Sequence, residues 1–260
     1  MQKMKRGLSI FVLATALMVP AAVAWADTLI GTDAGETLQG TPGPDQLYGE
    51  GGDDVLLGLG WHDFIEAGSG NDDVDGGGGV DLIIGGTGDD TINGANGADV
   101  VYAGAGEDEV LGGQGADQLF GQDGSDRLFG GSGADRIYAS LGEDFVDAGS
   151  GDDTITGEGN GITILAGGGD DMVSATGERL TVEGGGGHDR IRTGSGRDDV
   201  SGGPGRDSIA TGGLNDRIQA FDGRRDRVHC GRGRRDRVTH DPSDVLISCE
   251  QRTPGTGPIR

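Results

Sequence analysis

The sequence predicts an all-β solenoid that is built from nine-residue units. Every ninth residue from 27 to 216 is Asp, with three exceptions, and every ninth residue from 29 to 218 is Leu, Ile or Val. The exceptions to Asp are Glu36, Ile162 and Leu180. Segments such as 85–93 and 130–138 begin Gly-Gly-x-Gly-x-Asp, so glycine occupies the first, second and fourth positions of these units. Self-similarity at a fixed short period indicates a repeat architecture, and disordered acidic sequence does not require a periodic aliphatic.

Each unit divides into a glycine turn and a short strand. Glycine supplies the positive-φ conformations of tight turns. The last three residues of a unit, such as Thr91-Ile92-Asn93, alternate outward, inward and outward as in a strand. Two units therefore form one flattened coil with the aliphatics of both faces inside. Residues eighteen apart are expected on neighbouring strands, about 4.8 Å apart.

The repeated aspartates are expected to form one column on each of two edges. The first column is Asp45, Asp63, Asp81, Asp99, Asp117, Asp135, Asp153, Asp171, Asp189 and Asp207. The second column is Asp54, Asp72, Asp90, Asp108, Asp126 and Asp144, followed by Asp198 and Asp216. Carboxylates stacked this closely repel one another, and a cation between them would remove the repulsion. Ca²⁺ fits best, because it accepts six to eight carboxylate and carbonyl oxygens in a flexible shell, whereas no Cys or His recurs for softer metals.

The nonapeptide resembles the calcium-binding repeat of RTX (hemolysin-type) proteins, over about residues 40–219. The resemblance implies a right-handed parallel β-roll that folds when calcium fills its turns. It also implies that the sixth-position Asp of each unit is the side-chain ligand, which assigns that role to all the aspartates of the two columns. An acidic disordered tract and a metal-free solenoid are the alternatives.

The N-terminus resembles a secretory signal peptide over residues 1–26. A basic start at Lys3, Lys5 and Arg6 precedes a short apolar run. Ala24-Trp25-Ala26 offers a small-x-small cleavage site, with Ala22-Val23-Ala24 as a nearby alternative. An uncleaved membrane anchor is the alternative, although the apolar run is short for a span. We therefore expect a secreted, extracellular protein without a membrane span. RTX proteins usually carry a C-terminal export signal instead, so the chain departs from the family here.

The two ends of the array are expected to be caps. Residues 27–39 keep the core Leu but lack the glycine pattern, which is typical of a degenerate N-terminal cap. After residue 219 the register breaks, and residues 220–250 resemble the Arg-Asp-Arg-Val…Cys…Cys-Glu endings of bacterial secreted repeat proteins. Two cysteines in an exported chain indicate a disulfide between Cys230 and Cys249. Residues 251–260 are expected to be a loose tail.

One edge is interrupted where Ile162 and Leu180 replace Asp. We expect calcium to be missing there, while Ile164 and Val182 continue the core. His62 and His188 have no partners at the repeat spacing and are expected to be solvated side chains.

An apolar column is expected on the outside of one face. Tyr48, Ile84, Tyr102, Phe120 and Tyr138 follow the eighteen-residue spacing. Stacked aromatics stabilise strand pairing, so a structural role is favoured. A surface for self-association or for another partner is the alternative.

Composition and charge limit the function. The formal net charge is −24, so the arginines near the C-terminal end do not indicate a nucleic-acid partner. The array leaves too little other sequence for a catalytic domain, so no enzyme is expected. We expect a secreted calcium-binding protein whose folding is driven by Ca²⁺ bridging stacked turns. The alternative is an extracellular adhesin or matrix protein that uses the solenoid as a partner-binding surface.

Overall fold

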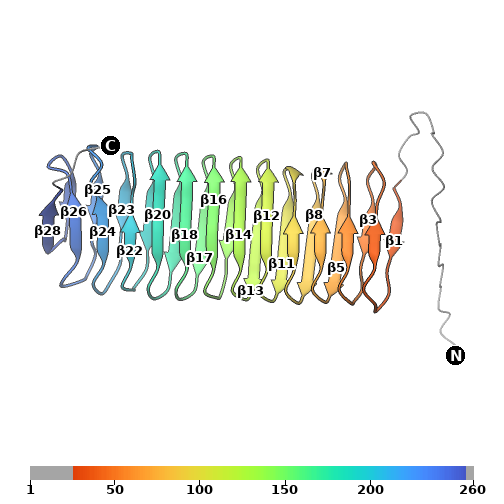
Figure 1. Cartoon of the computed structure of the whole chain (residues 1–260). Coiled ribbons are helices and arrows are strands. Elements are labelled where there is room, and N and C mark those ends of the chain that lie inside the picture. The colour runs from red at the N-terminus through yellow and green to blue at the C-terminus, as the bar shows by residue number, and fades with distance from the viewer. Residues whose placement is uncertain (1–25, 256–260) are drawn as a thin grey trace, which may run out of the picture.

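The computed structural model describes residues 26–255, which form a single elongated solenoid (Figure 1). The predicted signal peptide lies outside the described residues except for Ala26, as does the second half of the predicted tail. The described residues contain strands and turns but no helix, and hence no helix able to cross a membrane. The predicted all-β solenoid is therefore confirmed.

Two parallel sheets form the two long faces. The first sheet has 13 strands: β1 (Thr28–Ile30), β3 (Gln46–Tyr48), β5 (Phe64–Ser69), β8 (Leu82–Thr87), β11 (Val100–Ala105), β13 (Gln118–Asp123), β15 (Arg136–Ala139), β17 (Thr154–Glu158), β19 (Met172–Thr176), β21 (Arg190–Thr193), β23 (Ser208–Ala210), β25 (Arg227–His229) and β27 (Val245–Ile247). The second has 15 strands. Its main path is β2 (Thr37–Gln39), β4 (Val55–Leu57), β6 (Asp73–Asp75), β9 (Thr91–Asn93), β12 (Glu109–Gln114), β14 (Arg127–Ser132), β16 (Phe145–Ser150), β18 (Thr163–Gly168), β20 (Thr181–Gly186), β22 (Asp199–Ser201), β24 (Arg217–Ala220), β26 (Arg237–His240) and β28 (Gln251–Pro254). The short strands β7 (Gly78–Gly79) and β10 (Asn96–Gly97) pair beside this path.

The register follows the eighteen-residue spacing. Val101 pairs with Leu119 in the first sheet, and Val110 pairs with Leu128 in the second. Because consecutive units alternate between the sheets, each coil contributes one strand to each face. The aliphatics at every ninth position meet between the two sheets, and those from Leu47 to Ile218 are at most 2% exposed. The core is thus a thin double row of side chains.

The turns depend on glycine at particular places. Gly104 and Gly106 have φ of 124° and 152°, which favours glycine. A Cβ at Gly106 would also overlap the carbonyl oxygen of Gly88 in the preceding coil. The glycines therefore allow both the turn conformation and the close approach of successive coils.

The predicted aromatic column lies on the outer face of the first sheet. Tyr102, Phe120 and Tyr138 stack with ring centroids 4.6 Å apart and interplanar angles of 10° and 2°. Tyr48 packs instead against Phe64, at 5.5 Å, because Glu66 follows it in the column. The rings therefore contact one another along the solenoid axis.

Both sheets continue past the point where the nonapeptide register breaks. Ser208 pairs with Arg227, nineteen residues away, and Arg217 pairs with Arg237, twenty residues away. The extra residues lie in the turns, so the strands keep their alignment. The predicted disulfide between Cys230 and Cys249 is present, with both cysteines buried.

Candidate metal centre

The candidate metal centre is a column of buried aspartates along each rim of the solenoid. Each Asp ends a glycine turn and directly precedes a strand; Asp117 precedes β13 and Asp126 precedes β14. Every aspartate that the sequence analysis assigned as a ligand is buried, with at most 3% of its surface exposed. Carboxylates are normally exposed unless they are paired or bind a metal, so this burial needs compensation.

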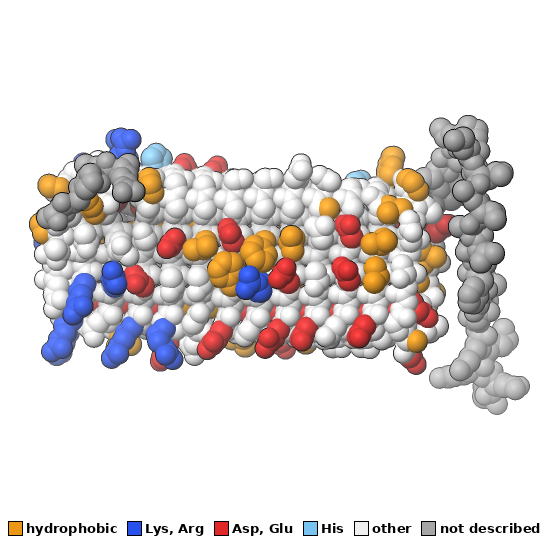
Figure 2. Space-filling model, viewed as in Figure 1, with side chains coloured by type: hydrophobic (Ala, Val, Ile, Leu, Met, Phe, Trp, Pro, Cys, Tyr) orange, Lys and Arg blue, Asp and Glu red, His pale blue; other side chains and the backbone are white. Residues whose placement is uncertain are grey.

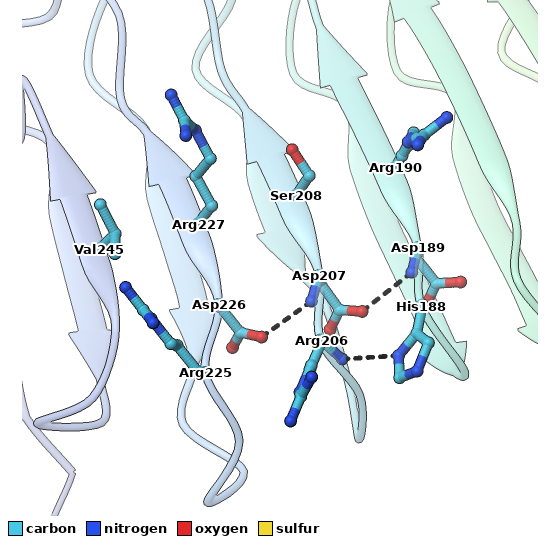
Figure 3. A pocket seen from close by; sticks show the side chains of 10 residues that line it. All are labelled: His188, Asp189, Arg190, Arg206, Asp207, Ser208, Arg225, Asp226, Arg227 and Val245. Atoms are coloured by element: carbon cyan, nitrogen blue, oxygen red, sulfur yellow. Dashed lines mark hydrogen bonds between the residues drawn. The ribbon is translucent and has the colours of Figure 1, made fainter.

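One carboxylate oxygen of each Asp is hydrogen-bonded to the coil before it. The backbone N–H of Asp99 donates to Oδ1 of Asp117 at 2.8 Å, and the N–H of Asp117 donates to Oδ1 of Asp135 at 2.8 Å. Figure 3 shows the same ladder from Asp189 through Asp207 to Asp226, with bonds of 3.0 and 2.9 Å. These hydrogen bonds join successive coils and supply a donor for Oδ1 of each Asp.

The second carboxylate oxygen has no such partner. Oδ2 is buried without a hydrogen bond in nearly all of these residues. They are Asp54, Asp63, Asp72, Asp81, Asp90, Asp99, Asp108, Asp117, Asp126, Asp135, Asp144, Asp153, Asp171, Asp189, Asp198, Asp207 and Asp216. A buried acceptor without a partner costs about 1–3 kcal/mol, and more when it is charged. A repeated row of such atoms therefore indicates a cationic ligand.

The electrostatics of the column agree with that interpretation. Burial raises the pKa of Asp117 to about 6 and that of Asp153 to about 7, although the N–H bond from the preceding coil lowers each pKa. Neighbouring carboxyls in the column raise each pKa further. A bound divalent cation would favour the ionised form and oppose both effects.

Backbone oxygens stand beside the carboxylates. The carbonyl oxygen of Gly130 and Oδ2 of Asp117 each lie 2.7 Å from the place where a Cβ of Gly112 would stand. Among residues 26–255, no three His, Cys, Asp or Glu side chains come close enough together to hold a metal ion. A bound ion would therefore be held by one or two carboxylates together with turn carbonyls. That all-oxygen donor set suits Ca²⁺.

Comparison with protein families agrees with this geometry. The model of the RTX calcium-binding nonapeptide repeat matches residues 30–60, 62–83, 84–119, 120–155 and 181–223, which together make up more than half of the chain. The chain belongs to the RTX calcium-binding nonapeptide repeat family. RTX repeats bind calcium, and proteins that carry them are typically secreted. A search of curated proteins gives no match to the chain.

The part of the array outside the RTX matches contains the two replaced aspartates. Residues 156–180 are unmatched, and Ile162 and Leu180 are 0% and 1% exposed. Their aliphatic side chains offer no oxygen to an ion. On the same rim the ladder resumes where Leu180 N–H donates to Oδ1 of Asp198 at 3.1 Å. The opposite rim keeps Asp153, Asp171 and Asp189.

The RTX ladder extends beyond the aspartates that were predicted from spacing. Asp226 and Asp236 accept from Asp207 N–H and Asp216 N–H, and their Oδ2 atoms are likewise buried without a partner. The nine-residue spacing did not predict them, because Asp226 follows Asp207 by nineteen residues and Asp236 follows Asp216 by twenty. The repeated Asp-Arg-Val triplet at both places was the available signal.

The first predicted ligand differs from the others. Oδ2 of Asp45 accepts from the N–H of Thr41 at 2.5 Å and from its hydroxyl at 3.0 Å. Since these bonds already satisfy Oδ2, Asp45 resembles a capping residue more closely than the later members of its column.

His62 and His188 have a role that the spacing did not reveal. Nδ1 of each ring accepts a backbone N–H from the next coil, from Val80 at 2.7 Å and from Arg206 at 3.1 Å. These exposed side chains therefore link neighbouring turns.

An open groove of about 410 Å³ beside His188 brings Ser208 and Asp189 together (Figure 3). Nδ1 of His188 accepts the N–H of Arg206, and Ser208 points away from the ring. Asp189 belongs to the buried ladder. These three residues do not form a nucleophile–base arrangement, which would need a hydrogen bond between nucleophile and base.

Proposed function

We propose that the protein is a secreted calcium-binding solenoid whose folding is driven by Ca²⁺ bridging stacked turns. The observation that carries the proposal is the repeated row of buried Oδ2 atoms without partners. Without a cation, the folded chain must bury many carboxylates beside one another and must also order a large number of glycines. Both costs favour an expanded chain, and calcium binding offsets them.

Binding and folding are therefore coupled. Extracellular calcium modules typically bind at about 10⁻⁴–10⁻³ M, so a chain of this kind would stay unfolded in a calcium-poor cytosol and fold outside the cell. The basic and apolar start of the sequence supports export through a cleaved signal peptide. The calcium-binding RTX repeats, which match more than half of the chain, support a non-catalytic role.

The test is a calcium titration of residues 27–260 that is monitored by far-UV circular dichroism. A chelator is then added to the calcium-loaded sample. We expect the β signal to appear with calcium and to be lost in chelator. Isothermal titration of the same sample should show binding over the same calcium range. A complete β signal in chelator would contradict the coupling, and an absence of binding heat would contradict the calcium assignment.

An adhesive or matrix function is the second candidate, and the aromatic column supports it. The rings of Tyr102, Phe120 and Tyr138 are half-buried on an outer face of the solenoid. However, they stack on one another, so their edges rather than their faces remain for a partner. An adhesin should lose retention of cells or polymer when Tyr102 and Phe120 are replaced by Ser, with calcium-induced folding kept.

A further inference from the structure

The C-terminal end of the solenoid has a basic surface, although residues 187–255 contain arginines and acids in nearly equal numbers. Every arginine from Arg190 to Arg252 is exposed. Most acids of this stretch belong to the buried ladder, and among residues 187–255 only Glu250 is an exposed acid. Between residues 26 and 178 the only Arg or Lys residues are Arg127 and Arg136. Figure 2 shows the result, because basic side chains gather at the left, C-terminal end while acidic side chains follow the rest of the lower rim.

Four of these exposed arginines line one groove, the open groove of about 410 Å³ described above. Arg190 and Arg227 bound one side of it. Arg206 and Arg225 bound the opposite side (Figure 3). A second hollow of about 420 Å³ shares Arg206 with the first and adds Arg224. The two hollows together are here called the basic groove.

The arginines of the basic groove have no carboxylate partner within the described chain. Among residues 26–255 the ion pairs join Arg127 to Glu109 and Arg217 to Asp199, and neither reaches the groove. A guanidinium presents five N–H donors and no acceptor, and it stays charged at any ordinary pH. Several such groups around one hollow repel one another, and an anion between them would remove that repulsion.

The aspartates beneath the basic groove do not supply that anion. In the ladder aspartates that line it, Oδ1 accepts a backbone N–H and Oδ2 is buried, as in Asp207 and Asp226. Both oxygens of Asp222, beside the second hollow, accept backbone N–H groups, from Gly205 and from Arg224, at 2.7 Å each. The groups that face the groove are therefore donors, and the nearby acceptors are already used or buried.

Two neutral donors complete the set. Nδ1 of His188 accepts the N–H of Arg206 at 3.1 Å, which leaves the ring proton on Nε2. Ser208 pairs with Arg190 on one side and with Arg227 on the other, so its hydroxyl lies between these two arginines. Neighbouring strands are about 4.8 Å apart, so the backbones of the two arginines are about 10 Å apart. Both guanidinium groups can therefore reach one small anion above Ser208.

We propose that the basic groove binds a tetrahedral oxyanion, which is the sulfate or phosphate group of a free anion or of an ester. The planar fork of arginine matches the oxygens of such a group with paired N–H···O bonds. Donors on both sides of the groove can serve three or four oxygens at once, whereas a carboxylate offers only two. The chain as a whole has a net charge of −24, so an anion would be held by this local arrangement and not by general attraction.

The test is isothermal titration of residues 27–260, in saturating calcium, with sodium sulfate and separately with phenyl phosphate. Phenyl phosphate replaces inorganic phosphate, which calcium precipitates. Sodium chloride and sodium acetate at the same ionic strength are the controls. We expect saturable binding of both tetrahedral anions and none of chloride or acetate. Binding of phenyl phosphate alone would assign the groove to phosphate esters. Binding of neither, or equal binding of acetate, would overturn the proposal.

Paired substitutions locate the site. Arg206→Gln with Arg227→Gln removes one arginine from each side of the groove, and we expect the affinity for sulfate to fall about tenfold or more. Arg217→Gln with Arg237→Gln removes the same charge from the second sheet at the same end of the solenoid, and this matched control should bind like the parent chain. Equal weakening in the two variants, each with a native circular dichroism signal, would show general attraction and would overturn the groove.

Chemical modification tests the unsubstituted chain, so it does not depend on the folding of a variant. Phenylglyoxal reacts with exposed arginines, and peptide mass spectrometry gives the rate at each one. Sulfate should slow the reaction at Arg206 and Arg227 severalfold and leave Arg217 and Arg237 unchanged. Uniform protection, or none, would contradict the site. Either result concerns the groove alone, because calcium-induced folding is measured separately by circular dichroism.

Discussion

The backbone N–H of Asp117 donates a 2.8 Å hydrogen bond to Oδ1 of Asp135, while Oδ2 of Asp135 is buried without a partner. Of the two oxygens of this carboxylate, one therefore has a hydrogen-bond donor within the chain and the other has none. Oδ1 joins coils with or without a metal. Oδ2 is satisfied only when a ligand from outside the chain, such as a cation, binds it.

This division predicts different outcomes for two replacements of Asp135. Asp135→Asn keeps an oxygen for the N–H of Asp117 but removes the charge, so we expect weaker calcium binding with little added loss of packing. Asp135→Ala also leaves the N–H unsatisfied, so it should cost about 1–3 kcal/mol more in calcium-saturated stability. Calcium titration and urea unfolding measure the two effects. Asp123→Asn, at an exposed position, is the control that should change neither, and equal effects of Asn and Ala at 135 would contradict the division.

The raised pKa values predict opposite pH trends with and without calcium. Burial raises the pKa of Asp117 to about 6 and of Asp153 to about 7 in the folded chain, above the ordinary value of 3.8. The folded state therefore binds more protons than the unfolded state, and the calcium-free fold loses stability as the pH rises from about 4 through 7. Calcium binding, which needs the ionised carboxylate, should strengthen over the same range.

Circular dichroism of metal-free protein at pH 5 and pH 8 checks the first trend, and calcium midpoints at the same two pH values check the second. A calcium-free chain that is more folded at pH 8 than at pH 5 would contradict the electrostatic account.

The interrupted rim predicts a gain of function. Ile162→Asp together with Leu180→Asp would restore the ladder from Asp144 to Asp198. We expect more calcium bound per chain and a less stable metal-free state, because two further carboxylates are buried. Equilibrium dialysis with calcium gives the stoichiometry. Ile162→Asn with Leu180→Asn supplies oxygens without charge and should not raise it, and an unchanged stoichiometry in the Asp variant would show that the gap lacks more than carboxylates.

We predict that adding one methyl group lowers stability by different amounts at two adjacent glycines. Gly169 has a φ of 140°, and a Cβ there would overlap the carbonyl oxygen of Gly151. Gly168 has open space around the same position and does not have a positive φ. Gly169→Ala should cost well over 1 kcal/mol, whereas Gly168→Ala should stay within about 0.5 kcal/mol. Urea unfolding in calcium compares them, and similar losses would contradict the close approach of the coils.

The sequence by itself determined the coil, the core and the two columns. A strict nine-residue spacing of one aliphatic and one acid has few physical solutions, because side chains in strands alternate and stacked coils must repeat. Val101 over Leu119 and Asp117 beside Asp135 follow from counting alone. The stacking of Tyr102 on Phe120 follows in the same way.

Only the tertiary structure decided how each atom is used. Spacing places Asp135 beside Asp117, but the backbone path decides that one oxygen meets an N–H and the other meets none. Counting also failed at Asp226 and Asp236, because the extra residues before them are absorbed in turns that keep the strands aligned. The reason is that sequence period controls which residues are neighbours, whereas burial and hydrogen bonding depend on where the folded backbone directs each group.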